Sequence, residues 1–450
     1  MEDTELTIAP SDYSLLTDLY ELTMAACYVG EGIDQRRASF EVSVRRLPAG
    51  FGYLIAMGLA QALDYLEKLR FDAAQIEALK ATGIFDHVPD AFWMRLSKTQ
   101  FEGDVWAVPE GTAIFPNEPI LRIEAPLWQA QLVETYLLNT INYQTLVATR
   151  AARMRDVAGR SSTLLEFGTR RAFSPQASIW AARAAIAGGL DDTSNVLAAL
   201  KLGRKPSGTM AHSLVMALST TDGTESEAFT AFHRYFPGST LLIDTYDTIA
   251  AARQLGDRLQ AGEIQLSAVR IDSGDLLMLS KQVRELLPGV AIFASGDLDE
   301  YRIAALKAEG AAIDGYGIGT QLVTGAPVNG VYKLVEIDGI PVMKESIGKI
   351  TYPGRKQIFR RIEAGRVQRD RLGLVTEAPD AETPLLQLVM KQGAVMQDNE
   401  LIGMIADRTA ASVASLPDAV RRLHQPESIS VDRSLELSQL IDSTRRGVKS

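Results

Sequence analysis

The chain has 450 residues, of which 46% are hydrophobic and 23% are charged, the composition of an ordinary globular protein long enough for two domains. Its formal net charge of −10 argues against nucleic-acid binding as the main role, although arginines can still gather around a phosphate in a local pocket. The acidic start lacks the pattern of a signal peptide, and no uninterrupted apolar run is long enough to span a bilayer, so we expect a cytoplasmic protein without membrane contact.

Helical and strand patterns are mixed in the first part of the chain. Apolar residues at helical spacing predict helices at residues 11–28, 54–69, 72–82 and 127 to about 158. Alternating patterns predict strands at residues 39–44, 105–108 and 114–123, the last interrupted by prolines. The single cysteine, Cys27, lies in an apolar run, where we expect a buried structural thiol. This mixture predicts that residues 1–130 form the N-terminal part of an α+β sandwich domain.

From about residue 164 the pattern changes to that of repeated strand-plus-helix units. Short apolar runs, each followed by a polar turn and usually by a helical pattern, occur at residues 164–167, 241–243, 268–271, 291–294 and 313–316. The later runs recur about every 22 to 29 residues, the length of one unit of an α/β barrel. We therefore predict a barrel-type catalytic domain at residues 131–325. In barrel enzymes the chemistry lies at the C-terminal ends of the strands, where the polar turns of this chain begin.

Strand patterns return after the predicted barrel, at residues 331–337, 340–343 and 358–362. They predict that residues 326–450 complete the N-terminal sandwich. The segment from about residue 427 carries mixed charge and predicts a loosely attached tail or a terminal helix.

His212 lies in the segment Gly-Thr-Met-Ala-His-Ser at residues 208–213, at the predicted start of a helix. The helix dipole there disfavours an imidazolium, which leaves a ring nitrogen available as a nucleophile or base. Helix N-terminal amides also favour an anion. A single histidine at a helix start is commonly a cap or a surface residue, but the neighbouring motifs favour a functional interpretation.

Arginines and an aromatic residue follow the first strand of the predicted barrel, in Phe167-Gly-Thr-Arg170-Arg171. The planar fork of a guanidinium suits a carboxylate or a phosphate, and we expect only one of two adjacent arginines to reach a shared ligand. The alternative is a salt bridge between domains. Phe167 is either core or a surface on which an aromatic ligand stacks.

Acidic residues stand at successive predicted strand ends, at Asp244, Asp272, Asp275 and Asp297. Such residues hold Mg²⁺, bind ribose hydroxyls or stabilise developing positive charge, and a single one is often just a helix cap. Arg270 lies two residues before Asp272 and so faces the same side of its strand. Together with the histidine segment, these residues predict an enzyme site that handles phosphate.

Alternate glycines at Gly315, Gly317 and Gly319, followed by Thr320, end the predicted barrel. Glycines let backbone amides approach an anion closely, and a late barrel strand is a frequent phosphate site. The segment lies too late in the chain, and lacks the leading strand–helix–strand context, for a dinucleotide fingerprint.

As an ordered set, these motifs resemble the nicotinate phosphoribosyltransferase family over nearly the whole chain up to about residue 400. The matching segments are residues 16–20, 40–48, 167–171, 193–195, 208–213, 244–247, 270–275, 295–297, 317–320 and 352–357. The resemblance implies an α/β fold: an irregular barrel of the type II phosphoribosyltransferases, plus a sandwich domain from both chain ends. It implies ATP-coupled transfer of a phosphoribosyl group from phosphoribosyl pyrophosphate to nicotinate, with Mg²⁺, in a homodimer with shared active sites.

The resemblance also implies roles for individual residues. The tyrosine matching Tyr20 reaches into the partner's site and stacks on the pyridine ring opposite the aromatic matching Phe167. The matches of Arg170, Thr209 and Arg270 contact nicotinate or the phosphoribosyl substrate, and ATP transiently phosphorylates the match of His212. Further substrate contacts are implied for Ser295, Gly296 and Asp297, and a 5′-phosphate cradle for Gly317, Gly319 and Thr320.

The physical account of this reaction agrees with the residue types. Displacement of pyrophosphate from an anomeric carbon develops positive charge on the ribose, which Asp272 and Asp244 could stabilise. Mg²⁺ would neutralise the leaving pyrophosphate, and its exact ligands are left open. The pyridine nitrogen is itself the nucleophile, so positioning should dominate.

Ser194 bears on the choice between nicotinate and nicotinamide. Nicotinamide-specific relatives carry an aspartate at the matching position, and a carboxylate there would repel nicotinate, so the serine favours the acid. Asp191 and Asp192 lie close enough in the chain to matter. The alternatives are a nicotinamide or quinolinate phosphoribosyltransferase, and a non-catalytic sensor of a phosphoribosyl ligand. His212 argues against the quinolinate enzymes, which use no phosphorylated histidine.

Overall fold

The computed structural model of the chain describes residues 6, 8–220, 224–346, 349–396 and 400–448. It divides into two compact units. Unit 1 comprises Met1–Leu146, Pro327–Leu401 and Ala411–Ser450, and unit 2 comprises Val147–Ala326 and Ile402–Ala410. Among the described helices, none combines the length and the apolar content that crossing a bilayer requires.

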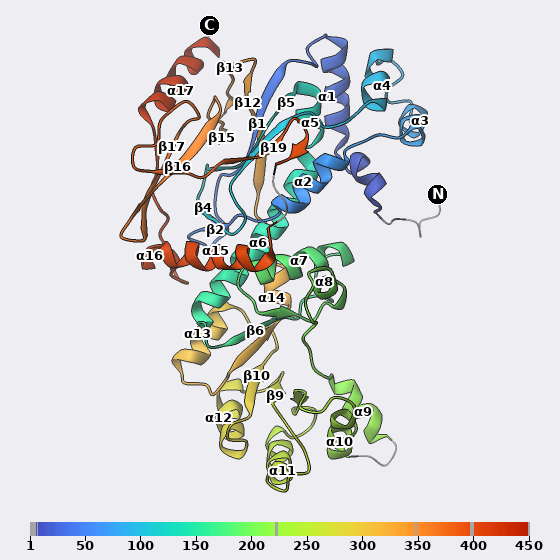
Figure 1. Cartoon of the computed structure of the whole chain (residues 1–450), viewed down its shortest axis with the longest axis vertical. Coiled ribbons are helices and arrows are strands. Elements are labelled where there is room, and N and C mark those ends of the chain that lie inside the picture. Colours follow the sequence, from blue (N-terminus) through green and yellow to red (C-terminus); the bar gives the residue numbers. More distant parts are fainter. Residues whose placement is uncertain (1–5, 7, 221–223, 347–348, 397–399, 449–450) are drawn as a thin grey trace. The chain divides into compact units, whose positions relative to one another are not determined.

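Unit 1 is built around a sheet to which both ends of the chain contribute (Figure 1). The order of its seven strands is β13-β12-β1-β5-β3-β19-β20, and β1 pairs antiparallel with both β5 and β12. The N-terminal strands are β1 (Arg37–Val44), β2 (Leu54–Ile55), β3 (Asp104–Ala107), β4 (Ala113–Ile114) and β5 (Pro119–Pro126). The later strands of this sheet are β12 (Gly330–Ile337), β13 (Ile340–Pro341), β19 (Gln387–Lys391) and β20 (Ala394–Val395).

A second sheet of unit 1 has the order β18-β16-β17-β21. Its strands are β18 (Thr383–Pro384), β16 (Lys356–Glu363), β17 (Arg366–Leu374) and β21 (Val431–Arg433). Two short pairs complete the strands: β2 with β4, and β14 (Glu345–Ser346) with β15 (Lys349–Ile350). Strands of alternating burial, such as β3, place one face on the core and leave the other more exposed.

The helices of unit 1 come from both chain ends as well. After a 3-10 helix at Pro10–Leu15 come α1 (Leu19–Gly30), α2 (Leu59–Lys68), α3 (Ala73–Ala81), α4 (Asp90–Ser97) and α5 (Leu127–Leu132). Helix α6 (Glu134–Ala158) contributes residues to both units, as does α15 (Ile402–Ser415), and α16 (Asp418–Arg421) and α17 (Leu435–Val448) end the chain. Leu22, Phe92 and Trp128 are among the residues that join α1, α4 and α5 in one apolar cluster.

Unit 2 is a parallel sheet of six strands in the order β7-β6-β11-β10-β9-β8. The strands are β6 (Thr163–Glu166), β7 (Asp192–Thr193), β8 (Leu241–Leu242), β9 (Ala268–Ile271), β10 (Ala291–Ala294) and β11 (Gly315–Ile318). Among the described residues no ladder joins β7 to β8. The predicted α/β class is confirmed, and a closed barrel stays a prediction.

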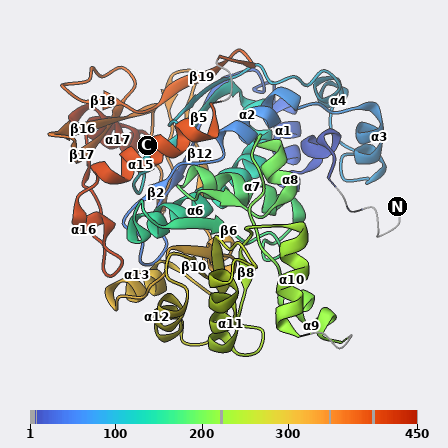
Figure 2. The same cartoon turned by 60° about the horizontal axis from the view of Figure 1, so that its bottom comes forward.

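Helices connect these strands, as parallel pairing requires. They are α7 (Pro175–Ala187), α8 (Val196–Lys201), α9 (His212–Ser219), α10 (Glu225–Tyr235), α11 (Thr248–Gln260), α12 (Leu276–Leu286), α13 (Glu300–Ala308) and the short α14 (Thr320–Val323). Figure 2 shows α11 between α10 and α12, and α11 packs against both. Because all six strands run the same way, the loops after them gather at one edge of the sheet.

Three expectations about local structure need correction. The helix expected at residues 54–69 is wrong at its start: Leu54–Ile55 pairs with β4, and the helix begins only after Gly58, whose left-handed φ of 103° interrupts it. The helix expected at residues 11–28 is divided into a 3-10 helix and α1. Cys27 is exposed, because α1 turns Leu22, Ala25 and Ala26 to the core and Cys27 away from it.

The last segment of the chain is the terminal helix, not a loose tail. Helix α17 packs against β17, and its Leu437 and Ile441 are buried. Ahead of it, β21 pairs in parallel with β17.

Candidate functional site

A cavity of about 890 Å³ opens at the C-terminal edge of the sheet in unit 2. The predicted residues Phe167, Arg170, Ser194, Thr209 and Arg270 all line it. The rest of the lining consists of Val196, Pro206, Ser207, Gly208, Met210, Ala211 and Phe236. Residues from the loops after β6 and β7, from the segment before α9 and from β9 therefore meet in one place, as the sequence motifs predicted.

Glu166 ties together two of the loops that line this cavity. It is fully buried at the end of β6, and its carboxylate accepts hydrogen bonds from the Gly168 N–H and from the Thr193 hydroxyl. Burial raises the pKa of Glu166. The Asn195 N–H in turn donates to the Thr193 hydroxyl over 2.9 Å, so the neighbouring Ser194 is held from both sides.

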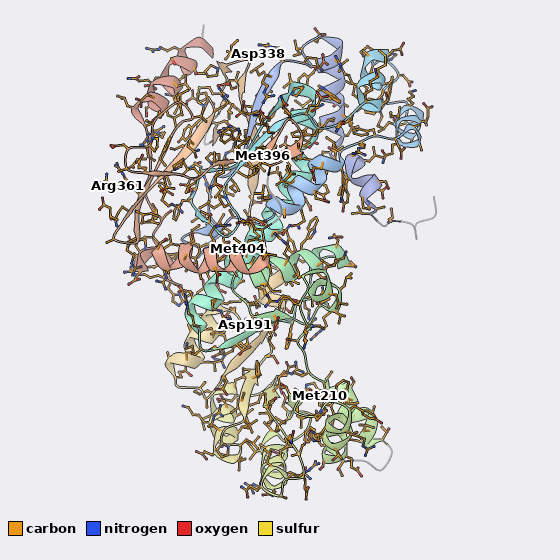
Figure 3. The ribbon with its side chains drawn as sticks, viewed as in Figure 1. Asp191, Met210, Asp338, Arg361, Met396 and Met404 are labelled. Atoms are coloured by element: carbon orange, nitrogen blue, oxygen red, sulfur yellow. The ribbon has the colours of Figure 1, made fainter. Side chains whose placement is uncertain are left out.

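Ser194, rather than the nearby aspartates, faces the cavity. Asp191 (labelled in Figure 3) accepts from Arg155 over 2.6 Å and from the Leu164 N–H over 2.7 Å. Asp192 pairs with Arg204 at 3.2 Å. Both carboxylates are thus engaged in holding β7, which leaves a neutral hydroxyl at the cavity wall.

Arg270 lines the cavity from β9, and not all of its N–H donors are paired within the described part of the chain. Its Nη2 donates to the carbonyl of Met210 over 2.9 Å, its Nη1 lies 3.9 Å from Asp272, and its Cζ lies 5.8 Å from the centre of the Phe167 ring. Nε is buried and has no hydrogen-bond partner among the described residues. Burial lowers the pKa of Arg270. Figure 3 shows Met210 on the segment that leads into α9.

The glycines of β11 make room for aromatic rings. A Cβ on Gly317 would lie 2.4 Å from the Phe167 ring, and one on Gly315 would lie 2.4 Å from the ring of Phe293. At Gly319 a Cβ would lie 3.2 Å from the Phe167 carbonyl oxygen. The close approach that these glycines permit is therefore, in this structure, to Phe167 and Phe293. The phosphate cradle expected at Gly317, Gly319 and Thr320 stays a prediction.

His212 is the first residue of α9, as its position in the sequence predicted. Its Nδ1 lies 3.1 Å from the Thr245 hydroxyl, and its Nε2 lies 3.9 Å from Asp244 Oδ1. Two consecutive residues after β8 therefore face the two ring nitrogens. Sequence reasoning named Asp244 and missed Thr245, although the segment Asp-Thr-Tyr-Asp had been singled out.

Asp244 and Asp272 are linked across neighbouring strand ends. Asp244 Oδ2 accepts from the Asp272 N–H over 2.9 Å and from the Ser273 hydroxyl over 2.6 Å, and the Ser295 hydroxyl donates to Asp272. The side chain of Asp244 is 2% exposed, and its Oδ1 has no hydrogen-bond partner within the described part of the chain. A buried acceptor without a donor is costly, and it is typical of a functional site.

The remaining predicted residues take different places. Gly296 has a φ of 94°, and a Cβ there would lie 2.3 Å from the Asp272 carbonyl oxygen, so glycine is required beside that aspartate. Asp297 adopts a left-handed φ of 47°. Asp275 caps α12 by accepting from the N–H groups of Leu277 and Met278, each over 3.1 Å.

Tyr20 belongs to unit 1, on α1. It is 44% exposed. Burial and the nearby carboxylates raise the pKa of Tyr20, which keeps the hydroxyl neutral. Its stacking role stays a prediction.

Comparison with known proteins covers nearly the whole chain. Residues 15–142 match the nicotinate phosphoribosyltransferase (NAPRTase) N-terminal domain, residues 162–357 match the NAPRTase family, and residues 375–441 match the NAPRTase C-terminal domain. Nicotinate phosphoribosyltransferase pncB2 of Mycobacterium tuberculosis is 43% identical, over 91% of this chain and 89% of the relative. The nicotinate phosphoribosyltransferase of Bacillus subtilis is 36% identical, over 94% of this chain and 93% of the relative.

The fold is also similar to that of a solved relative. The crystal structure of human nicotinic acid phosphoribosyltransferase superposes with a TM-score of 0.83 at 30% identity, covering 95% of this chain and 99% of that one. The likeness therefore extends to both units.

Proposed function

The chain belongs to the nicotinate phosphoribosyltransferase family, and on that premise we propose that it transfers a phosphoribosyl group from phosphoribosyl pyrophosphate to nicotinate. The products are nicotinate mononucleotide and pyrophosphate, and the reaction serves NAD salvage. The observation that carries this proposal is the cavity of unit 2, in which Phe167, Arg270 and Ser194 meet.

The cavity suits an aromatic carboxylate. The Phe167 ring offers a stacking surface for a pyridine, and Arg270, with an unpaired Nε, offers charged donors for the carboxylate. Arg170 is exposed at the same cavity and adds positive charge. Ser194 presents no negative charge that would repel an acid, so the geometry favours nicotinate over nicotinamide.

Asp244 and Asp272 are proposed to act on the phosphoribosyl donor. As pyrophosphate leaves, positive charge develops on the ribose, and carboxylates fixed beside it stabilise that charge. Mg²⁺ is typically bound by one or two carboxylates together with substrate phosphates. The unpaired Oδ1 of Asp244 and the carboxylate of Asp272 fit such a shared set of ligands. When bound, Mg²⁺ would neutralise charge on the pyrophosphate.

His212 is proposed to couple the reaction to ATP. A ring nitrogen forms a bond to the γ-phosphorus as ADP leaves, and hydrolysis of the phosphohistidine then yields inorganic phosphate. Support comes from the contacts of both ring nitrogens with Thr245 and Asp244, which orient the imidazole.

We further propose a homodimer in which Tyr20 completes the partner's site. Leu19, Tyr20 and Met24 are exposed apolar or aromatic residues on α1, between 37% and 51% exposed, which a second subunit would cover.

The test compares nicotinate, nicotinamide and quinolinate as acceptors, with phosphoribosyl pyrophosphate and Mg²⁺, with and without ATP. Mononucleotide from nicotinate, raised by ATP in the wild type but not in His212→Ala, is the expected result. Product from nicotinamide alone would contradict the argument from Ser194. No product from any acceptor would contradict the proposed function and favour a phosphoribosyl-ligand sensor.

A further inference from the structure

Glu166 is a buried carboxylate beside the cavity of unit 2, and the proposed function assigns it no role. It is the last residue of β6, which lies between β7 and β11 in the sheet, and it is fully buried. It has no ion-pair partner in the described part of the chain, and burial raises its pKa. Burying a carboxylate without a cation is costly, so its hydrogen bonds must compensate.

Each oxygen of this carboxylate binds a different loop. Oε1 accepts from the backbone N–H of Gly168, in the loop after β6, and Oε2 accepts from the hydroxyl of Thr193, at the end of β7. The Asn195 N–H donates to the same hydroxyl oxygen over 2.9 Å, which leaves the hydroxyl proton for Glu166. Because both groups donate to it, they favour the ionised carboxylate.

The hydrogen bond to Gly168 fixes the loop that carries two cavity residues, Phe167 and Arg170. The carbonyl of Gly168 accepts from the Arg171 N–H over 2.7 Å, which closes a turn around Arg170. A Cβ on Gly168 would lie 2.8 Å from Oε1 of Glu166, so glycine allows this close approach. The first oxygen therefore determines where this loop lies.

The hydrogen bond to Thr193 fixes a second part of the cavity wall. Ser194, which lines the cavity, follows Thr193 directly, and its N–H donates to the backbone carbonyl of Glu166 over 2.9 Å. The Thr193 carbonyl accepts from the Ser207 N–H over 2.9 Å, and residues 206–211 all line the cavity. One carboxylate therefore joins the segments that supply most of the lining.

We propose that Glu166 is a positioning residue for the acceptor substrate. Its carboxylate holds the loops after β6 and β7 together, so that Phe167, Arg170 and Ser194 keep the spacing that an aromatic carboxylate requires. The inference rests on the proposed function, which places nicotinate in this cavity. Glu166 itself contacts no substrate, forms no covalent bond and exchanges no proton.

The first test compares the two substrates of Glu166→Gln. Glutamine has a similar volume but a single acceptor oxygen, so one of the two donors loses its partner. We expect the KM for nicotinate to rise by about tenfold, while kcat and the KM for phosphoribosyl pyrophosphate each change by less than about threefold. A KM for nicotinate that is unchanged, or that rises no more than the other KM, would overturn the inference.

Asp314→Asn is the matched control for this carboxylate-to-amide change. Like Glu166, Asp314 accepts from a backbone N–H of a neighbouring strand, here that of Ile292 over 2.8 Å. It precedes β11 and so lies at the opposite edge of the sheet from the cavity. Both KM values should stay within about threefold of wild type in this variant.

A double-mutant cycle with Thr193 tests whether the effect passes through the hydrogen bond. Thr193→Val removes the hydroxyl and should raise the KM for nicotinate by about fivefold, whereas Thr193→Ser retains it and should stay within about threefold of wild type. The double variant Glu166→Gln/Thr193→Val should lie within about threefold of Glu166→Gln, because both changes break the same bond. Effects that multiply in the double variant would contradict a shared role.

Hydrogen–deuterium exchange of the free protein tests the positioning without substrate or turnover. In Glu166→Gln we expect the amides of residues 167–172 and 193–211 to exchange about tenfold faster than in wild type, because their common anchor is weakened. Asp314→Asn should leave both segments unchanged. Unchanged exchange in both segments of Glu166→Gln would overturn the inference.

The tests separate this inference from the proposed function. Wild-type protein that forms no mononucleotide would contradict the proposed function, whereas the exchange rates still decide whether Glu166 joins the two loops. Active wild-type protein together with an unchanged KM for nicotinate in Glu166→Gln would overturn the inference and leave the proposed function intact. Thermal unfolding of each variant establishes that it is folded.

Discussion

Two arginine–aspartate pairs, one in each unit, differ in how fully they are buried and hydrogen-bonded. In unit 1, Arg360 on β16 pairs with Asp370 on β17 through contacts of 2.6 to 3.2 Å, and both side chains are almost fully buried. In unit 2, Arg270 and Asp272 lie 3.9 Å apart, and the aspartate is 38% exposed. The first pair satisfies its charges internally, whereas the second leaves them available.

The difference separates a pair that stabilises the fold, in unit 1, from a pair at the candidate site, in unit 2. Beside Arg360, burial and the nearby Asp370 raise the pKa of a third buried group, Glu118, well above its usual range. Around Arg270, by contrast, Nε of the arginine and Oδ1 of Asp244 have no hydrogen-bond partner among the described residues. A ligand that supplies an acceptor and a cation would satisfy both.

The largest expected effect comes from breaking the buried Arg360–Asp370 pair of unit 1. Arg360→Met leaves Asp370 as a buried, uncompensated charge, which should lower the free energy of unfolding by about 3–5 kcal/mol. Denaturant unfolding measures the change. Arg361→Met is the control, because Arg361 (labelled in Figure 3) is 41% exposed and its pairing with Glu363 should contribute less than about 1 kcal/mol. Equal losses of unfolding free energy in the two variants would contradict the stabilising role that we assign to the buried Arg360 pair.

Breaking the Arg270–Asp272 pair of unit 2 should lower activity more than stability. Arg270→Met removes charged donors aimed into the cavity, and we expect kcat/KM for nicotinate to fall by about 10²- to 10³-fold. The free energy of unfolding should fall by less than it does in Arg360→Met, because Asp272, which lies 3.9 Å from Arg270, is 38% exposed. Steady-state kinetics and denaturant unfolding on one preparation give both numbers. A large loss of stability with little loss of activity would reverse the comparison.

A smaller effect should follow from Gly317→Ala. The added methyl would meet the Phe167 ring at 2.4 Å, so the ring must move, at a cost of about 1–3 kcal/mol in unfolding free energy. Because Phe167 lines the cavity, the KM for nicotinate should rise as well. Gly403→Ala tests the opposite case, since nothing lies within 4 Å of a Cβ there and the substitution should stabilise α15 slightly. An unchanged KM in Gly317→Ala would show that the contact between Gly317 and Phe167 does not affect nicotinate binding in the cavity of unit 2.

The sequence predicted the parts of this site that depend on strand order. Polar residues after parallel strands meet at one edge whatever the details of the loops, which is why the motifs at Phe167 and Arg270 line one cavity. Ser194 lines the same cavity, but only the family resemblance had pointed to it. The class of the fold followed from the same repeat of strand and helix. A periodic pattern does not reveal contacts between side chains of different loops. The Thr245–His212 contact and the hydrogen bonds by which Glu166 joins two loops are therefore seen only in the structure.

The errors of sequence reasoning have a physical cause as well. An apolar run does not reveal which side of a helix is covered, so Cys27 was placed in the core although it is exposed. Similarly, the pattern at residues 54–69 does not show that a glycine with positive φ separates a short strand from the helix. The phosphate cradle expected at Gly317 and Gly319 is no such error and stays a prediction. The structure adds a packing reason for Gly315 and Gly317, because a Cβ at either position would meet a phenylalanine ring.

The smallest expected effect concerns Glu21, a buried carboxylate of unit 1 that has no ion-pair partner in the described part of the chain. Glu21 accepts from the Thr135 N–H over 2.9 Å and from the Thr135 hydroxyl over 2.6 Å, yet burial raises the pKa of Glu21 to about 7. Because the folded state binds this proton more tightly than the unfolded state, wild-type stability should fall as the pH rises from about 4.5 to about 7. Glu21→Gln cannot ionise, so its unfolding free energy relative to wild type should rise by about 1–2 kcal/mol between pH 5 and pH 8. Denaturant unfolding at several pH values measures this; a difference that stays constant with pH would show that Glu21 is ionised throughout and is held by its threonine donors alone.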